Sequence, residues 1–221
     1  MYDLCLFDLD GTLTDPKIGI TKSYRYALAA FDIHEELENL EKFIGPPLRE
    51  CFKDFYGLSE SDTEKAVAKF REYFSKTGML ENTVYPGIPG ILRDLMNNGK
   101  TLAVATNKVS LYSVEIIKHF GLDKYFAFVS GDDMDGSLTM NGKRDIILLA
   151  LDTLDPDRLM RAVMIGDRRH DITGARDAGI DSIGITWGYG SRSEQTDAGA
   201  TWIAENTDEL LSLLISSPFP K

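Results

Sequence analysis

Two aspartates one residue apart, Asp8 and Asp10, follow directly after the short apolar run of residues 2–7. Like charges this close repel each other unless a cation or a proton lies between them. Gly11 follows at once and marks the turn at which a buried strand would end. The arrangement is unfavourable for stability, so it indicates a site that binds a cation or moves a proton.

Further polar residues follow other apolar runs with the composition of strands, namely Thr106, Asn107, Asp167 and Asp171. Lys143 stands just before the expected helix of residues 144–154, which leads to the strand before Asp167. The carboxyl ends of parallel strands meet at one crevice of an open sheet, so we expect these side chains to converge on Asp8 and Asp10. Carboxylates, a hydroxyl, an amide and one ammonium group would then share a small volume.

A cluster with this much negative charge needs a cation. Oxygen ligands beside a bound phosphate group favour Mg²⁺. One aspartate can then attack phosphorus as a nucleophile and form an aspartyl-phosphate. Thr106, Asn107 and the backbone N–H groups of residues 9–11 are suited to hold the phosphoryl oxygens. Lys143 can neutralise the charge that the phosphoryl group and Asp8 bring together.

Each piece of this pattern is common on its own, and two other kinds of site are excluded. An EF-hand loop fails, because Leu13 stands where its sixth position needs glycine and Gly19 where its twelfth needs glutamate. A P-loop ending at residues 99–101 fails, because Asp94 replaces its first glycine. The functional prediction therefore depends on the order of all the pieces along successive strand ends.

Short β-branched runs alternate with amphipathic segments over much of the chain. We expect strands over residues 3–7, 101–106, 126–130, 162–165, 182–186 and 201–204, and helices over 88–98, 110–120, 144–154, 171–178 and 208–214. Gly99, Gly121 and Gly179 stand where helix ends favour a positive φ. This alternation predicts an α/β fold with a Rossmann-like parallel sheet covered by helices on both faces.

Residues 16–82 break the alternation, because their apolar residues recur with helical spacing. We therefore expect an all-helical cap domain over 16–82, inserted into an α/β core domain made of residues 1–15 and 83–221. An insertion that leaves the first strand at its carboxyl end would lie over the crevice where ligands bind.

The 221 residues are 43% hydrophobic, which suffices for one full core and a smaller second unit. A net charge of -11 argues against a general nucleic-acid binder. Cys5 and Cys51 form no CxxC pattern and indicate neither a disulfide framework nor a zinc site. With no leader-like start and no apolar run near the ~18 residues of a membrane span, we expect a cytoplasmic protein that binds neither membranes nor nucleic-acid polymers.

Taken together, these motifs resemble those of the haloacid dehalogenase-like hydrolase superfamily. The matching segments are Asp8-Leu9-Asp10-Gly11-Thr12, Thr106-Asn107, Lys143 and Gly166-Asp167-Arg168-Arg169-His170-Asp171. The resemblance covers essentially the whole chain, including the helical insertion. Three further segments are similar to the branch of phosphoglycolate phosphatases and bacterial 5′-nucleotidases, and slightly more to the latter: Gly45-Pro46-Pro47-Leu48, Met134-Asp135-Gly136 and Trp187-Gly188-Tyr189-Gly190. Arg144 departs from the pattern, since many relatives carry proline after the motif lysine.

The resemblance implies a role for each matching residue. Asp8 would be the nucleophile, and Asp10 would protonate the leaving oxygen and then activate water. The Mg²⁺ ligands would be Asp8, the carbonyl of Asp10 and Asp167, with Asp171 holding a metal-bound water or orienting Lys143. Thr106, Asn107 and Lys143 would bind the phosphoryl group. The aspartate at position 10 resembles the pattern of phosphatases and phosphomutases, which protonate an alkoxide leaving group. The resemblance therefore argues against dehalogenation.

The leading hypothesis is a Mg²⁺-dependent phosphatase that hydrolyses a small phosphorylated metabolite or a nucleoside monophosphate, phosphoglycolate phosphatase-like or 5′-nucleotidase-like. The alternatives are a sugar-phosphate phosphomutase on the same scaffold and a phospho-regulated receiver domain, which the helical insertion fits poorly. Arg49 in the cap is a predicted substrate contact, although a solvated arginine at a helix start explains it equally well. For the oligomeric state, we expect either a monomer or a homodimer.

Overall fold

The computed structural model describes residues 1–138 and 142–215. The chain forms two compact units, Met1–Thr14 with Val84–Lys221 and Asp15–Thr83. We call the first the α/β unit and the second the helical unit. Short strands β2 (Thr14–Asp15) and β3 (Thr83–Val84) pair with each other where the chain passes between the units. That the helical unit acts as a cap stays a prediction.

The α/β unit is built on a six-stranded sheet in the order β5-β4-β1-β6-β7-β8, with all pairs parallel. Its strands are β1 (Leu4–Phe7), β4 (Thr101–Val109), β5 (Phe128–Asp132), β6 (Ala162–Gly166), β7 (Asp181–Ile185) and β8 (Trp202–Ala204). Strand β1 lies in the middle, and Leu4 pairs with Thr101 of β4 on one side and Ala162 of β6 on the other. All four residues of β1 are buried, as a strand covered on both faces requires.

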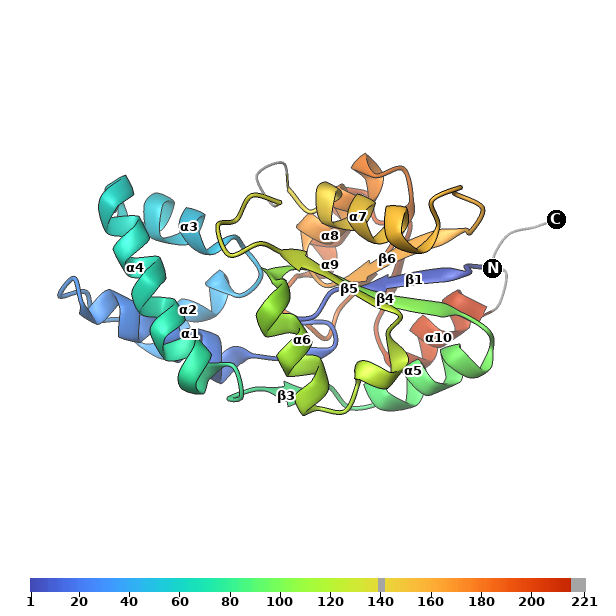
Figure 1. The fold of residues 1–221 in the computed structure, drawn as a ribbon, viewed down its shortest axis with the longest axis horizontal. Helices are drawn as coiled ribbons and strands as arrows, with labels where there is room; N and C mark the ends of the chain where they lie inside the picture. Colours follow the sequence, from blue (N-terminus) through green and yellow to red (C-terminus); the bar gives the residue numbers. More distant parts are fainter. Residues whose placement is uncertain (139–141, 216–221) are drawn as a thin grey trace. The chain divides into compact units, whose positions relative to one another are not determined.

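Helices cover both faces of this sheet, with α5, α6 and α10 on one face and α7, α8 and α9 on the other (Figure 1). Their bounds are α5 (Ile88–Asn97), α6 (Ser110–His119), α7 (Arg144–Leu154), α8 (Arg169–Asp177), α9 (Arg192–Ala198) and α10 (Thr207–Ile215), with a 3₁₀ turn η4 (Asp123–Tyr125). Leu4 and Leu6 of β1 pack with Ile146, Ile147 and Ala150 of α7 in one core cluster. Because successive side chains of a strand point to opposite faces of the sheet, alternate residues pack against different helix layers.

The helical unit has its own core. It contains α1 (Lys17–Ala29), α2 (Leu37–Leu40), η1 (Glu41–Phe43), α3 (Leu48–Glu50), η2 (Cys51–Phe55), α4 (Glu60–Tyr73) and η3 (Phe74–Gly78). The Tyr24 ring lies at the centre, 5.3 Å from the ring centroids of Phe43 and Phe52 and 4.9 Å from that of Phe70. These are contact distances for aromatic pairs, so the rings join α1 to the segments that follow.

The predicted fold class is confirmed, and the expected strands and helices of the α/β unit form with shifts of a few residues. Two differences affect the site. Strand β4 continues past Thr106 to Val109, and α8 begins at Arg169, two residues before its predicted start. Within the described part of the chain, no helix is both long and apolar enough to cross a membrane.

Candidate active site

Three neighbouring strands deliver the predicted site residues to one edge of the sheet. Asp8 follows β1 directly, Asp167 follows β6, and Thr106 lies near the end of β4. The backbone N–H of Asp8 donates to the carbonyl of Ile165, 2.8 Å away, which holds the ends of β1 and β6 together. The chain runs from β1 to β4 on one side and reaches β6 on the other. This is the type of switch point at which open α/β sheets bind ligands.

Three carboxylates meet at this edge. Asp8, Asp167 and Asp171 each offer an oxygen within 4.8 Å of the others, and all three residues are buried. The Nζ of Lys143 lies 2.8 Å from Oδ1 of Asp8 and also contacts Oδ1 of Asp171. One ammonium group faces three carboxylates, so the cluster keeps excess negative charge.

Burial and the charges of the neighbouring groups shift the pKa values of the cluster. Burial, with Asp171 and Asp8 nearby, raises the pKa of Asp167 to about 8. Burial also raises the pKa of Asp171 to about 6, although Lys143 opposes the shift. Burial disfavours the charged form of Lys143, but Asp171 and Asp8 outweigh it and raise the pKa of that amine. A divalent cation among these oxygens would relieve the repulsion, so the donor set fits a hard metal ion.

The loop after β7 fixes Asp167. The N–H of Tyr189 donates to Oδ2 of Asp167 over 2.7 Å. A Cβ added at Gly188 would lie 2.4 Å from the same Oδ2 and 2.3 Å from the carbonyl of Gly11, so only glycine allows this approach. Oδ1 of Asp167 is buried and accepts no hydrogen bond from any described residue. One oxygen is thus anchored and the other is left to a ligand such as a metal ion.

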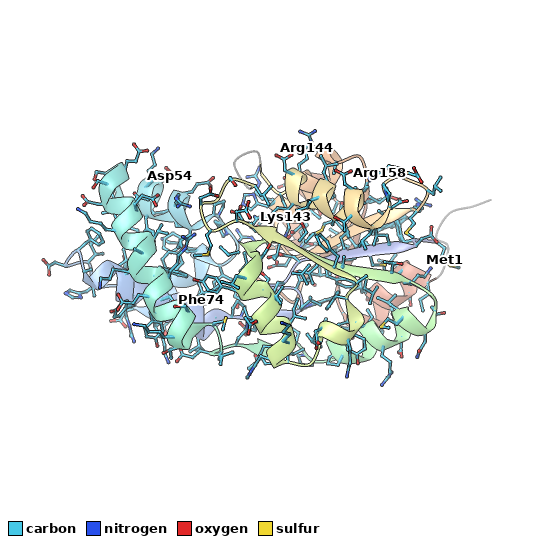
Figure 2. All side chains as sticks on the ribbon, in the orientation of Figure 1. Met1, Asp54, Phe74, Lys143, Arg144 and Arg158 are labelled. Atoms are coloured by element: carbon cyan, nitrogen blue, oxygen red, sulfur yellow. The ribbon has the colours of Figure 1, made fainter. Side chains whose placement is uncertain are left out.

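Lys143 enters the cluster from the start of α7. It is 3% exposed, whereas its neighbour Arg144 lies at the outer surface (Figure 2). Helix α8 supplies its partner Asp171 from its first turn, where Oδ2 of Asp171 accepts the N–H of Arg168 over 2.9 Å. The site lysine and its partner are therefore both held at helix starts.

Asp10 is separate from the three-carboxylate cluster and has a lysine of its own. The Nζ of Lys108 lies 2.7 Å from Oδ2 of Asp10, and both side chains are nearly buried. Burial raises the pKa of Asp10, and Lys108 opposes that shift. Sequence reasoning missed Lys108. Its position directly after Thr106-Asn107 was the one available signal.

The predicted phosphate-binding residues Thr106 and Asn107 lie on the same strand as Lys108. Oγ1 of Thr106 accepts the N–H of Lys108 over 3.2 Å. Oδ1 of Asn107 and Oγ1 of Thr12 are both buried, and neither has a hydrogen-bond partner among residues 1–138 and 142–215. Buried polar atoms without partners are unfavourable, so these two groups are suited to a polar ligand.

Arg49, the predicted substrate contact, lies in the helical unit and has a partner there. Its Nε lies 2.6 Å from Oε1 of Glu64 and its second terminal nitrogen 3.1 Å from Oε2. This fork occupies one of the two edges at which a guanidinium can bind a carboxylate or phosphate with two hydrogen bonds. A substrate contact by Arg49 stays a prediction.

Known proteins resemble this chain along most of its length. The family model for haloacid dehalogenase-like hydrolases matches residues 5–185. A 5′-nucleotidase from Pseudomonas aeruginosa is 45% identical over 194 residues, which are 87% of this chain and 86% of that protein. Tyrosine-protein kinase PtkA of Mycobacterium tuberculosis is 39% identical over 215 residues, 96% and 72% of the two chains. A phosphoglycolate phosphatase from Agrobacterium fabrum is 31% identical over 192 residues, which are 84% of this chain and 81% of that protein.

A solved structure extends this likeness to the whole fold. The crystal structure of a predicted phosphatase from Clostridium acetobutylicum matches with a TM-score of 0.90 at 43% identity, covering 96% of this chain and 97% of that one. The predicted superfamily and the predicted phosphatase class of enzyme are confirmed at this level. The chain belongs to the haloacid dehalogenase-like hydrolase family.

Proposed function

We propose that the protein is a Mg²⁺-dependent phosphatase that hydrolyses a small phosphomonoester through an aspartyl-phosphate on Asp8. The observation that carries this proposal is the separation of two carboxylates at one sheet edge. Asp8 lies in a cluster of three acids with Lys143, whereas Asp10 pairs with Lys108. A nucleophile and an acid–base group need such different environments.

The residues present fit a divalent ion. Asp8, Asp167 and Asp171 would hold Mg²⁺ with the carbonyl of Asp10, and Oδ1 of Asp167 has its ligand position open with respect to the described side chains. When bound, Mg²⁺ supplies positive charge that lets an anionic phosphoryl group approach an anionic nucleophile.

Each of the site residues then has its own role in the two steps of the reaction. An oxygen of Asp8 attacks phosphorus while the bond from phosphorus to the leaving oxygen breaks, and Asp10 gives that oxygen a proton. A water molecule then attacks the aspartyl-phosphate, Asp10 takes a proton from it, and Asp8 is released. Thr106 and Asn107 bind the phosphoryl oxygens, and Lys143 orients Asp8 through their ion pair.

The names of the relatives support two candidate substrates, and the acidic residue at position 10 argues against dehalogenation. A nucleoside 5′-monophosphate is the first candidate, because the relative with 45% identity is named a 5′-nucleotidase. Phosphoglycolate is the second, because it matches the other branch that the sequence resembles. The helical unit is proposed to cover the site and to select between them, with Arg49 as one contact.

A phosphate-release assay with and without Mg²⁺ tests the proposal. The panel contains nucleoside 5′-monophosphates, phosphoglycolate, sugar phosphates and a phosphotyrosine peptide. We expect Mg²⁺-dependent release, lost in Asp8→Asn and kept in Asp94→Asn, which changes a half-buried aspartate on α5 outside the candidate site. Isomerisation of a sugar phosphate without net phosphate release would instead support the phosphomutase. Full activity of Asp8→Asn would overturn the assignment of the nucleophile.

A further inference from the structure

The geometry points to Lys108 as a positioning residue for the proton-transferring carboxyl of Asp10, an inference that rests on the proposed function. None of the sequence motifs assigns a role to this lysine. Its Nζ is 2.7 Å from Oδ2 of Asp10, and the two side chains are only 10% and 11% exposed. A nearly buried ion pair beside the nucleophile is too confined to be a solvated surface contact.

An irregularity in the sheet builds this position. The register between β4 and β5 shifts after Thr106, which pairs with Gly131, and resumes at Val109, which pairs with Asp132. Asn107 and Lys108 are thus the extra residues of a bulge, which re-aims side chains. A Cβ added at Gly131 would lie 2.6 Å from the carbonyl of Lys108, so β5 has glycine where the bulge approaches it.

The ion pair separates the two oxygens of Asp10. Lys108 holds Oδ2, whereas Oδ1 is buried and has no hydrogen-bond partner in the part of the chain that the structure describes. A carboxyl fixed at one oxygen presents the other in a constant direction. We therefore assign proton transfer to Oδ1 and anchoring to Oδ2.

The positive charge of Lys108 also stabilises the form of Asp10 that the first step produces. In the first step the bond from Asp8 to phosphorus forms, the bond to the leaving oxygen breaks, and the proton of Asp10 moves to that oxygen. The carboxylate left on Asp10 then lies against an ammonium group. In the second step the same carboxylate takes the proton of the attacking water. Lys108 stabilises the anionic form that links the two steps.

This role predicts a dependence on the leaving group. An alkoxide needs the proton of Asp10 as it departs, whereas p-nitrophenolate is a stable anion and departs without it. We expect Lys108→Met to lower kcat/KM for an alkyl phosphomonoester by about 10- to 100-fold and kcat/KM for p-nitrophenyl phosphate by less than about threefold. The ratio kcat/KM is the relevant quantity because it reports the steps up to departure of the leaving group, whereas kcat also includes hydrolysis of the aspartyl-phosphate, which both substrates share. Lys108→Arg restores part of the loss on the alkyl substrate, because it keeps the positive charge.

The experiment measures kcat and KM on both substrates for these variants, for Asp10→Asn and for the double variant Asp10→Asn with Lys108→Met. If Lys108 acts through Asp10, its removal causes no further loss once Asp10 is neutral. Lys118→Met, which changes an exposed lysine on α6, is the matched control. Thermal unfolding of each variant shows whether it folds. If Lys108→Met does not fold, the activities of Lys108→Arg and the wild type are compared instead.

Two results would overturn the inference. Equal losses of kcat/KM on both substrates, or a full additional loss in the Asp10→Asn background, would mean that Lys108 contacts the phosphoryl group directly. Failure of the proposed function looks different, because the wild type would then release no phosphate from either substrate or Asp8→Asn would remain active.

Discussion

Replacing Asp167 with asparagine should make the metal-free protein more stable at neutral pH, although the same change removes a proposed metal ligand. Burial, with Asp171 and Asp8 adding to it, raises the pKa of Asp167 from 3.8 to about 8. Between these values the folded state holds a proton that the unfolded state has lost. The contribution of Asp167 to the stability of the metal-free wild type therefore falls as the pH rises from about 4 to about 8.

The size of the effect follows from that shift. Each pKa unit corresponds to ~1.4 kcal/mol, which sets an upper limit of ~4 kcal/mol at pH 7 for an unrelaxed site. Relaxation around the charge reduces this, and we expect Asp167→Asn to gain ~1–3 kcal/mol. Asparagine has the same shape, and its amide oxygen can accept the hydrogen bond from the N–H of Tyr189.

Urea unfolding with chelator and with Mg²⁺ measures this prediction across the pH range. Mg²⁺ should reverse the order of stability, because a ligand at a hundred times its Kd adds ~2.7 kcal/mol to a protein that binds it. Asp94→Asn, at a half-buried position outside the candidate site, should shift neither curve by more than ~0.5 kcal/mol. If the metal-free asparagine variant is less stable than the wild type from about pH 5 to about pH 8, the carboxylate is net stabilising and the reasoning fails.

Three further changes test other parts of the site. Asp8→Asn should abolish phosphate release while the far-UV circular dichroism stays that of the wild type; retained turnover would contradict this. Gly188→Ala should lower Mg²⁺ affinity in a calorimetric titration and cost ~1–3 kcal/mol in urea unfolding, because its Cβ would meet Asp167 at 2.4 Å. Arg49→Ala should alter selectivity between nucleoside 5′-monophosphates and phosphoglycolate, yet change stability by less than ~1 kcal/mol, because its pair with Glu64 is partly exposed. Identical selectivity would retire Arg49 as a substrate contact.

The strand ends of the site could be predicted from the sequence, because one topological rule places Asp8, Thr106 and Asp167 at one edge of a parallel sheet. Lys108 could not be, since the predicted strand ended at Thr106 and the bulge that follows depends on pairing with β5. The role of Gly188 was equally hidden. It depends on an approach to Gly11 between segments far apart in the sequence.

The partner of Arg49 shows a different limit. The position of this arginine after a Gly-Pro-Pro-Leu segment said nothing about Glu64, which follows 15 residues later on α4. Arg49 lies in the three-residue helix α3, which is too short for a helical period to indicate which distant residue it faces. The chemistry of the side chain was therefore predictable, and its partner was not.

The central place of β1 also bears on how the enzyme acquires its activity. Strand β1, which carries the proposed nucleophile, is synthesised before its pairing residues Thr101 and Ala162, which follow about 100 and 160 residues later. Until then, the apolar strand has neither of its neighbours, and the segments of the sheet edge are separate. The acidic cluster therefore cannot assemble until β6 and α8 have been synthesised, and nascent chains that end before β6 are expected to lack it.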